Sequence, residues 1–218
     1  MMLNSPATLL RNLLIIISLV LFSAACGGEQ KDDVYSETPP TIYDEFMDNL
    51  RAACGGAYPG GLTQEPEGDD MLEGDELLIA HFVECDPDED VVKIAFHIET
   101  GPDEWDRSRT WIFERTPRGL DIRHDHREED GSPSEVTMYG GPSRAQVEIN
   151  ENRMEFISIE RTEETGMARG WRVLMEPGER YVYGTYRGQD WSWRVDFDLS
   201  ETAETPPPAW GQGEDSEA

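Results

Sequence analysis

The chain is poor in positive charge. Its 218 residues include 18 Lys and Arg against 46 Asp and Glu, which gives a formal net charge of −28. A surface this acidic repels phosphate, which excludes nucleic acid as a partner and argues against a polybasic module for lipid surfaces. Lysine occurs only as Lys31 and Lys93, beside 16 arginines. Many carboxylates with few lysines are typical of a salt-adapted surface, because salt screens the repulsion among like charges.

Leucine, isoleucine, valine and phenylalanine are also scarce once the N-terminus is set aside. The first 25 residues hold 12 of the 44 such residues, and the remaining 193 positions carry only 32. So low a fraction, combined with high charge, is common in disordered chains. The same 193 positions contain six Trp and seven Tyr, however, and these supply a large apolar area. We therefore expect one folded domain with a core rich in Trp and Tyr.

Common catalytic and cofactor-binding motifs are missing. The sequence has no Gly-x-Ser-x-Gly elbow, no Gly-x-x-x-x-Gly-Lys phosphate loop and no glycine fingerprint for dinucleotides. The 46 acids give no means of picking out a catalytic carboxylate pair. The sequence therefore names no cofactor and no reaction.

Residues 1–25 have the features of a targeting segment. Arg11 supplies the positive charge, and residues 13–22 form an apolar run that is too short for a membrane span of about 20 residues. The small residues Ser23, Ala24 and Ala25 then precede Cys26, an order that resembles the signal of bacterial lipoproteins.

The resemblance implies that Cys26 is diacylated, becomes the mature N-terminus and anchors the protein in the lipid bilayer. Ser23 stands where such signals usually have Leu. Gly27 follows the cysteine in place of the Asp that retains lipoproteins in the inner membrane, which implies an outer-membrane protein facing the periplasm. Ordinary secretion with a free cysteine is the alternative.

Cys54 and Cys85 are the two remaining thiols. In an oxidising compartment outside the cytoplasm, an even pair is typical of a disulfide. A catalytic thiol is the alternative, although no motif surrounds either residue. We expect a Cys54–Cys85 disulfide.

Polar segments flank the expected domain at residues 41–200. Residues 26–40 are rich in acids and end in Pro39-Pro40, which indicates a tether. Residues 201–218 contain five acids, no bases and three consecutive prolines, which predicts a disordered acidic tail.

Residues 41–54 are predicted to form a helix. Thr41 is a suitable N-cap, and Asp44 and Glu45 place negative charge in the first turn. Apolar residues follow at helical spacing, and two glycines end the segment: Ile42, Phe46, Leu50 and Cys54, then Gly55 and Gly56.

In the rest of the domain, apolar and polar residues alternate with a period of two, most clearly from Trp191 to Leu199. Turn residues separate the alternating runs, including a Gly140-Gly141-Pro142 turn. About ten short strands at this spacing predict a mainly β fold, a single antiparallel meander closed into a barrel or sandwich, lipocalin-like in outline, with one N-terminal helix. The expected strands are 77–85, 92–98, 107–115, 119–127, 135–139, 144–149, 153–161, 170–176, 179–187 and 191–199.

One predicted hairpin contains the residues whose side chains are suited to ligand binding or catalysis. If the chain turns at Pro117-Arg118, Trp111 lies opposite His124 and Arg109 opposite His126. The two histidines then continue the apolar face of their strand. We interpret this face as a candidate ligand pocket or as structural packing in a polar interior; the candidate residues are Arg109, Trp111, His124, His126, Thr137 and Tyr139.

A metal site is a further hypothesis for the same hairpin. Two histidines at i and i+2 on a strand can reach one ion, and neutral imidazole is a common ligand. Glu128 or Glu135 would supply a third ligand. A His-x-His pair alone does not define a metal site, so His124 and His126 are only candidates. The other histidines have simpler interpretations, with His97 on a solvated strand face and His81 at the edge of the core.

Two runs of sequence carry a resemblance to known proteins. DRSRTWIF at 106–113 and GLDIRHDHREEDGSPSEVTMYGG at 119–141 resemble motifs of uncharacterised secreted or lipid-anchored proteins of Gram-negative bacteria. The resemblance spans about residues 46–198. It implies an envelope protein and carries no activity with it.

Three functions remain open from the sequence. The first is a non-enzymatic envelope lipoprotein whose domain binds a small ligand or contacts envelope proteins. The second is an envelope hydrolase or metal-dependent enzyme centred on His124, His126 and Arg109. The third is a purely structural or assembly role. A deep cavity lined by Trp111 and the two histidines would favour binding or catalysis over the third.

Overall fold

The computed structural model describes residues 41–69, 71–86, 89–144 and 149–213. The expected signal peptide, Cys26 and the tether lie outside this part of the chain, as do residues 145–148 of an expected strand. None of the helices in the described ranges is both long and apolar enough to cross a membrane.

Helix α1 spans Ile42–Arg51 and begins where the sequence predicts. Thr41 and Asp44 form a capping box, in which the Thr41 N–H donates to the Asp44 carboxylate at 2.7 Å. The helix ends three residues earlier than expected, because the chain turns over residues 52–55 and Gly55 has a φ of 76°. Its buried face consists of Phe46, Met47 and Leu50.

Ten antiparallel strands form one sheet, in the order β6-β5-β4-β3-β2-β1-β10-β9-β8-β7. The predicted mainly β fold with an N-terminal helix is confirmed. The strands are β1 (Ala57–Gln64), β2 (Leu78–Glu84), β3 (Val91–Gly101), β4 (Glu104–Thr116), β5 (Gly119–His126), β6 (Tyr139–Pro142), β7 (Arg153–Ile157), β8 (Arg169–Glu176), β9 (Arg180–Arg187) and β10 (Asp190–Asp198).

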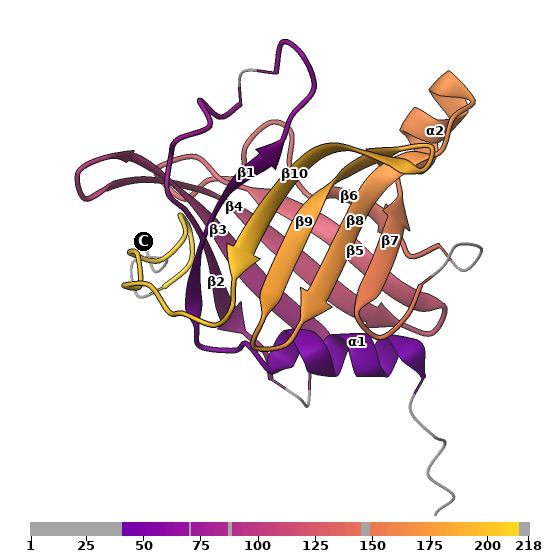
Figure 1. Cartoon of the computed structure of the whole chain (residues 1–218), viewed down its shortest axis with the longest axis horizontal. Helices are drawn as coiled ribbons and strands as arrows, with labels where there is room; N and C mark the ends of the chain where they lie inside the picture. The colour runs from indigo at the N-terminus through magenta and orange to yellow at the C-terminus, as the bar shows by residue number, and fades with distance from the viewer. Residues whose placement is uncertain (1–40, 70, 87–88, 145–148, 214–218) are drawn as a thin grey trace, which may run out of the picture. The chain divides into compact units, whose positions relative to one another are not determined.

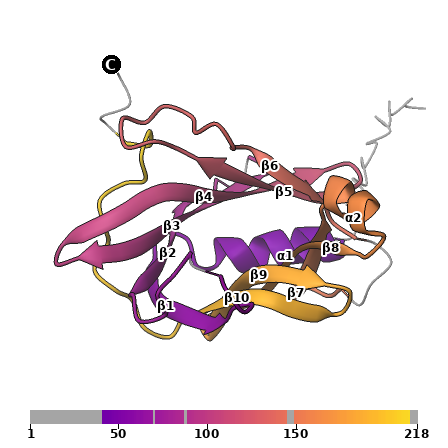
Figure 2. The ribbon, with the colours of Figure 1, turned by 90° about the horizontal axis from the view of Figure 1, so that it is seen from above.

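The sheet curls so that its two halves, strands β1–β6 and strands β7–β10, face each other. Trp111 of β4 stacks on Tyr183 of β9, with ring centroids 4.2 Å apart, although four strands separate β4 from β9 in the sheet order. Figure 2 shows these two halves on either side of α1. The first strand, β1, pairs with the last, β10, and this pairing joins the halves.

The edge strands β6 and β7 meet at a seam that no continuous ladder of described residues closes. An isolated bridge links Ser143 to Phe156, and the Arg144 N–H donates to the Glu155 carbonyl at 2.8 Å. The predicted Gly140-Gly141-Pro142 turn is instead part of β6. A Cβ on Gly141 would lie 1.9 Å from the Ile157 carbonyl oxygen, so glycine here permits close approach of two backbones.

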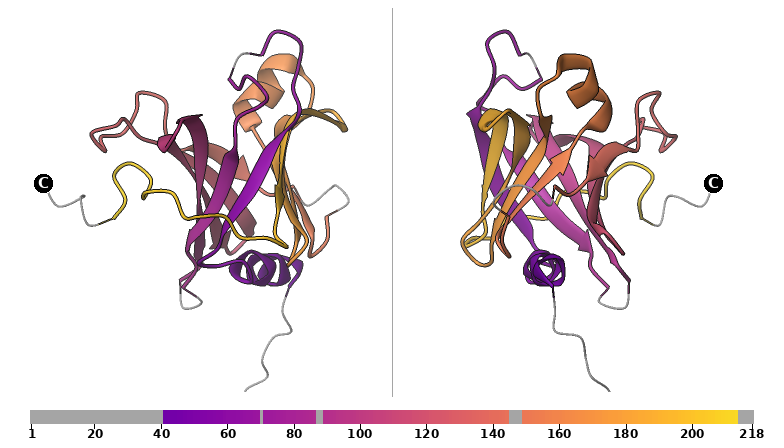
Figure 3. Two further views of the ribbon diagram at one scale, coloured as in Figure 1. Left: turned by 60° about the vertical axis from the view of Figure 1, so that its left-hand side comes forward. Right: turned by 90° about the vertical axis from the view of Figure 1, so that its right-hand side faces the viewer.

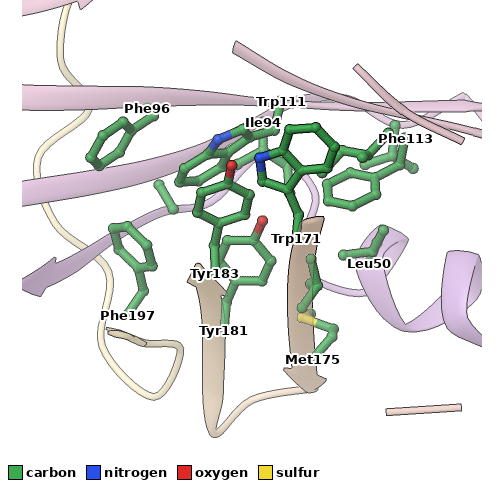
Figure 4. Close-up of a cluster of buried hydrophobic side chains, with 14 of the residues drawn as sticks. Leu50, Ile94, Phe96, Trp111, Phe113, Trp171, Met175, Tyr181, Tyr183 and Phe197 are labelled. Carbon is green, nitrogen blue, oxygen red and sulfur yellow. The ribbon is translucent and has the colours of Figure 1, made fainter. Parts of the chain in front are cut away.

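Helix α1 covers one end of the sheet (Figure 1). The helix packs against β3, β4 and β8, and the ring centroids of Phe46 and Phe113 lie 6.5 Å apart. Asp44 accepts a hydrogen bond from Arg115 of β4 at 2.7 Å. In Figure 4, Leu50 reaches from α1 toward the aromatic core between the two halves.

The predicted disulfide joins Cys54 to Cys85. It ties the turn after α1 to the residue that follows β2. Two backbone bonds support the same junction, because the Gly55 N–H donates to the Phe82 carbonyl and the Phe82 N–H donates to the Gly56 carbonyl. The end of the sheet that α1 covers, which we call the closed end, is therefore fixed covalently as well as by packing.

The segment 201–213 lies on the outside of the sheet, which differs from the expected disordered tail (Figure 3). The Ala203 N–H donates to Ala57 of β1, and the Trp210 N–H donates to Arg107 of β4. The segment therefore crosses β2 and β3, which lie between those strands. Three of the five expected tail acids fall at 214–218, outside the described residues, whereas the Pro206–Trp210 stretch has apolar surface to bury.

The expectation that His97 is solvated is wrong. Its side chain is fully buried, and Trp105 packs edge-on against it at 6.4 Å. The residue does lie on the outer strand face, but the C-terminal segment crosses that face. Burial, together with the charge of the neighbouring His81, lowers the pKa of His97 to about 4.

A second short helix, α2 (Ile159–Thr165), replaces the end of the strand expected over 153–161. None of its residues is buried, so it contributes little to the core. It lies at the opposite end of the sheet from α1 (Figure 1).

Candidate functional site

The β4–β5 hairpin has the predicted register. Trp111 pairs with His124 and Arg109 with His126, as the turn at Pro117-Arg118 requires. Trp111 and His124 are buried on the inner face of the curled sheet. The hairpin therefore presents a row of aromatic and basic side chains to the interior.

A cavity of about 350 Å³ lies inside the sheet and includes five of the six expected pocket residues. These five are Arg109, Trp111, His124, His126 and Tyr139. Elements distant in sequence complete the wall: the β1–β2 loop, α2, and strands β3, β8, β9 and β10. Their lining residues are Pro66, Asp69, Met71, Phe96, Arg161, Trp171, Tyr183, Thr185, Arg187, Ser192 and Trp193.

Aromatic rings form most of the apolar wall. The Trp111 ring stacks with Phe96, at 4.8 Å and 18° between planes, and with Tyr183, at 4.2 Å and 28°. Figure 4 shows Trp171 beside this stack. Because the rings hold one another in place, the wall is a preformed flat surface, suited to another flat apolar group.

His124 is held by the protein on both ring nitrogens. Nδ1 lies 3.1 Å from the Tyr139 carbonyl oxygen, which can only accept, so Nδ1 carries the hydrogen. Nε2 then accepts from the Tyr183 hydroxyl at 2.5 Å. Burial lowers the pKa of His124 to about 3, which keeps the ring neutral at pH 7. Neither nitrogen has a lone pair left for a metal ion.

His126, Tyr139 and Arg109 form a second polar group on the cavity wall. His126 Nε2 lies 3.2 Å from the Tyr139 hydroxyl, and burial lowers the pKa of His126. The Arg109 guanidinium donates to Asp106 at 2.6 Å and to Ser108 at 2.9 Å. Asp106 thus fixes the position of Arg109 and neutralises part of its charge.

Thr137 lies outside the cavity, contrary to expectation. Its hydroxyl accepts from the His126 backbone N–H at 2.7 Å and donates to Asp125 at 3.2 Å. In the strand expected over 135–139, alternation would put Thr137 and Tyr139 on one face. Met138 has a φ of 54°, however, which breaks the alternation and turns Thr137 to the other side.

The proposed third metal ligands do not join the histidines. Glu128 and Glu135 are both exposed, and neither lines the cavity. Within residues 41–213, as far as the structure describes them, no group of three His, Cys, Asp or Glu side chains is arranged to hold a metal ion.

Sequence reasoning missed the opposite wall of the cavity. Arg187 shares a strand face with Tyr183 and Thr185, so the period of two in β9 could have grouped them. Arg161 was hidden, because its segment was expected to be the end of a strand. Neither segment could be placed against the hairpin without knowing how far the sheet curls.

The comparisons with known proteins add no relative. No family model, no curated protein and no solved structure matches the chain.

Proposed function

We propose that this protein is a lipid-anchored bacterial envelope protein whose barrel-like domain binds a small ligand without transforming it. The observation that carries the proposal is the preformed cavity of about 350 Å³, with stacked aromatic walls and a few polar groups. Pockets for small molecules are typically apolar hollows of this kind, with few polar groups to orient the ligand.

The contacts of His124 support binding over catalysis. Both ring nitrogens of His124 form hydrogen bonds within the protein, so the ring can act neither as a base toward a substrate nor as a ligand of a metal ion. Burial raises the pKa of the Tyr183 hydroxyl well above its ordinary value, which makes it a poor nucleophile. These contacts argue against a role for His124 in the alternative, a hydrolase or metal-dependent enzyme centred on His124 and His126.

The cellular location rests on the N-terminal sequence. The Cys26 lipoprotein signal, with Gly27 after it, supports acylation and the outer membrane facing the periplasm. The Cys54–Cys85 disulfide is compatible with an oxidising compartment. We expect the full-length chain to enter the detergent phase in a phase-separation assay and Cys26→Ser to remain in the aqueous phase. A Cys26→Ser protein that still enters the detergent phase would disprove the anchor.

Ligand binding is tested with N-phenyl-1-naphthylamine, an uncharged aromatic dye that fluoresces in apolar sites. We expect the protein to bind it, and Thr185→Phe to reduce the affinity at least tenfold by filling the cavity. Thr100→Phe is the matched control, because Thr100 is exposed and does not line this cavity. No binding by the wild type, or equal binding by the Thr185→Phe variant, would disprove the proposal.

A further inference from the structure

A smaller cavity of about 100 Å³ adjoins the main one and is lined by three arginines. It shares Trp171, Thr185 and Ser192 with the main cavity, together with two of the arginines. No Asp or Glu of the described residues lines it. Its lining is Ser158, Arg161, Arg169, Gly170, Trp171, Thr185, Tyr186, Arg187 and Ser192.

These arginines have no carboxylate partner among the described residues, although the chain has a large excess of carboxylates. Eleven of the 16 basic side chains in the described residues form ion pairs within 4.0 Å. Within the same part of the chain, Arg161, Arg169 and Arg187 form none. Three guanidinium groups without a described carboxylate partner around one small cavity form an arrangement suited to binding an anion.

A buried donor of one of these arginines supports the same conclusion. The Nε of Arg169 is buried, and among the described atoms it has no hydrogen-bond acceptor. A buried donor without an acceptor is costly, unless a ligand supplies one. Burial raises the pKa of Tyr139, while the charges of Arg109 and Arg161 oppose that rise. The charge of Arg161 therefore reaches the polar groups of the main cavity.

We propose that the ligand is a small aromatic anion. Its flat ring system lies against Trp111, Tyr183 and Trp171 in the main cavity. Its carboxylate, sulfonate or phosphate group enters the smaller cavity, where Arg161, Arg169 and Arg187 bind it. This assignment rests on the ligand-binding function proposed above and adds the charge of the ligand. The acidic surface outside repels anions, so the arginines must supply the selectivity locally.

A pair of matched dyes tests the assignment. N-phenyl-1-naphthylamine and 8-anilinonaphthalene-1-sulfonate share one ring framework, and only the second carries an anionic group. We expect the wild type to bind the sulfonate dye about tenfold more tightly than the neutral dye in low salt. High salt should reduce this preference, because Arg161 and Arg187 are exposed at the mouth.

The critical variant is Arg161→Gln/Arg187→Gln. We expect it to lose about tenfold in affinity for the sulfonate dye and to bind the neutral dye within about twofold of wild type. The control is Arg118→Gln/Arg180→Gln, which removes the same charge from exposed arginines outside both cavities. It should bind both dyes as the wild type does.

The outcomes separate the two proposals. If the neutral dye binds in the cavity but the sulfonate dye binds no more tightly, the anion assignment is wrong and ligand binding stands. The same holds if the control pair loses as much affinity as the critical pair, because the effect then comes from net charge. If neither dye binds, or if Thr185→Phe changes neither, the ligand-binding function fails as well.

Discussion

The two ends of the curled sheet differ in how their side chains are used. At the α1 end, apolar residues fill the space, and Asp44 pairs with Arg115 across the junction. At the α2 end, the short helix buries nothing, and Arg161 and Arg187 remain without carboxylate partners in the part of the chain that the structure describes. The α1 end is filled by packed side chains, whereas the α2 end has a cavity and arginines without a described carboxylate partner, where we propose that a ligand binds.

The largest difference between the ends should come from Leu50→Ala. Leu50 is fully buried beneath the sheet, so its truncation should lower the free energy of unfolding by about 3 kcal/mol. Arg187→Gln at the α2 end should leave the free energy of unfolding unchanged, because that side chain is exposed and forms no ion pair with a described residue. Urea unfolding of both variants measures the contrast. Comparable losses in the two would remove it.

Lowering the pH from 7 to 5 should reduce the free energy of unfolding through His124, on the cavity wall, and not through Asp44, at the closed end. The folded pKa of His124 is about 3, below its ordinary value of 6.5, so the unfolded state binds the proton more readily. The stability that neutral His124 contributes is full above pH 6.5 and falls as the pH drops toward 3. Between pH 7 and pH 5 this loss amounts to about 2 kcal/mol.

Urea unfolding at pH 7 and pH 5 measures this loss, which should be smaller in His124→Gln by that amount. Asp44→Asn is the closed-end comparison. Burial raises the pKa of Asp44, but hydrogen bonds from Arg115 and Thr41 outweigh it and lower the pKa to about 2. Its contribution is lost only below its unfolded value of 3.8, so Asp44→Asn should leave the change between pH 7 and pH 5 unaltered. An unaltered change in His124→Gln would contradict the assignment.

The smallest effect is expected from Thr41→Ala, which removes the N-cap of α1. The helix then loses the side-chain acceptor for the Asp44 N–H, at a cost of about 1 kcal/mol. Dye binding should be unchanged, because the cap lies at the closed end. Thr41→Ser keeps the hydroxyl and serves as the control in the same urea titration. A loss of dye affinity in Thr41→Ala would show that the two ends are coupled.

Sequence reasoning succeeded where the determinants were local. The N-cap at Thr41, the Cys54–Cys85 pair and the register of the β4–β5 hairpin all depend on residues close in sequence or few in number. Strand alternation also placed Trp111 and His124 on the inner face.

It failed where glycine or long-range packing decided the structure. Strand β1 was missed because Pro59, Gly60 and Gly61 hide its alternation. A Cβ on Gly60 would lie 2.3 Å from the Asp196 carbonyl oxygen, a contact with β10 that no local pattern reveals. The sequence does not predict the position of Arg187 in the cavity for the same reason, because Arg187 lies opposite the hairpin only once the sheet has curled.

The pairing of β1 with β10 also sets the order of folding. Gly60 of the first strand lies beside Phe197 of the last, so nearly the whole domain must be present before the two halves can join. Contacts of such long sequence separation are slow to form, because the loop between them must first be closed. Until β10 arrives, β1 presents an unpaired edge, and we expect the half-formed sheet to be the state most prone to aggregation.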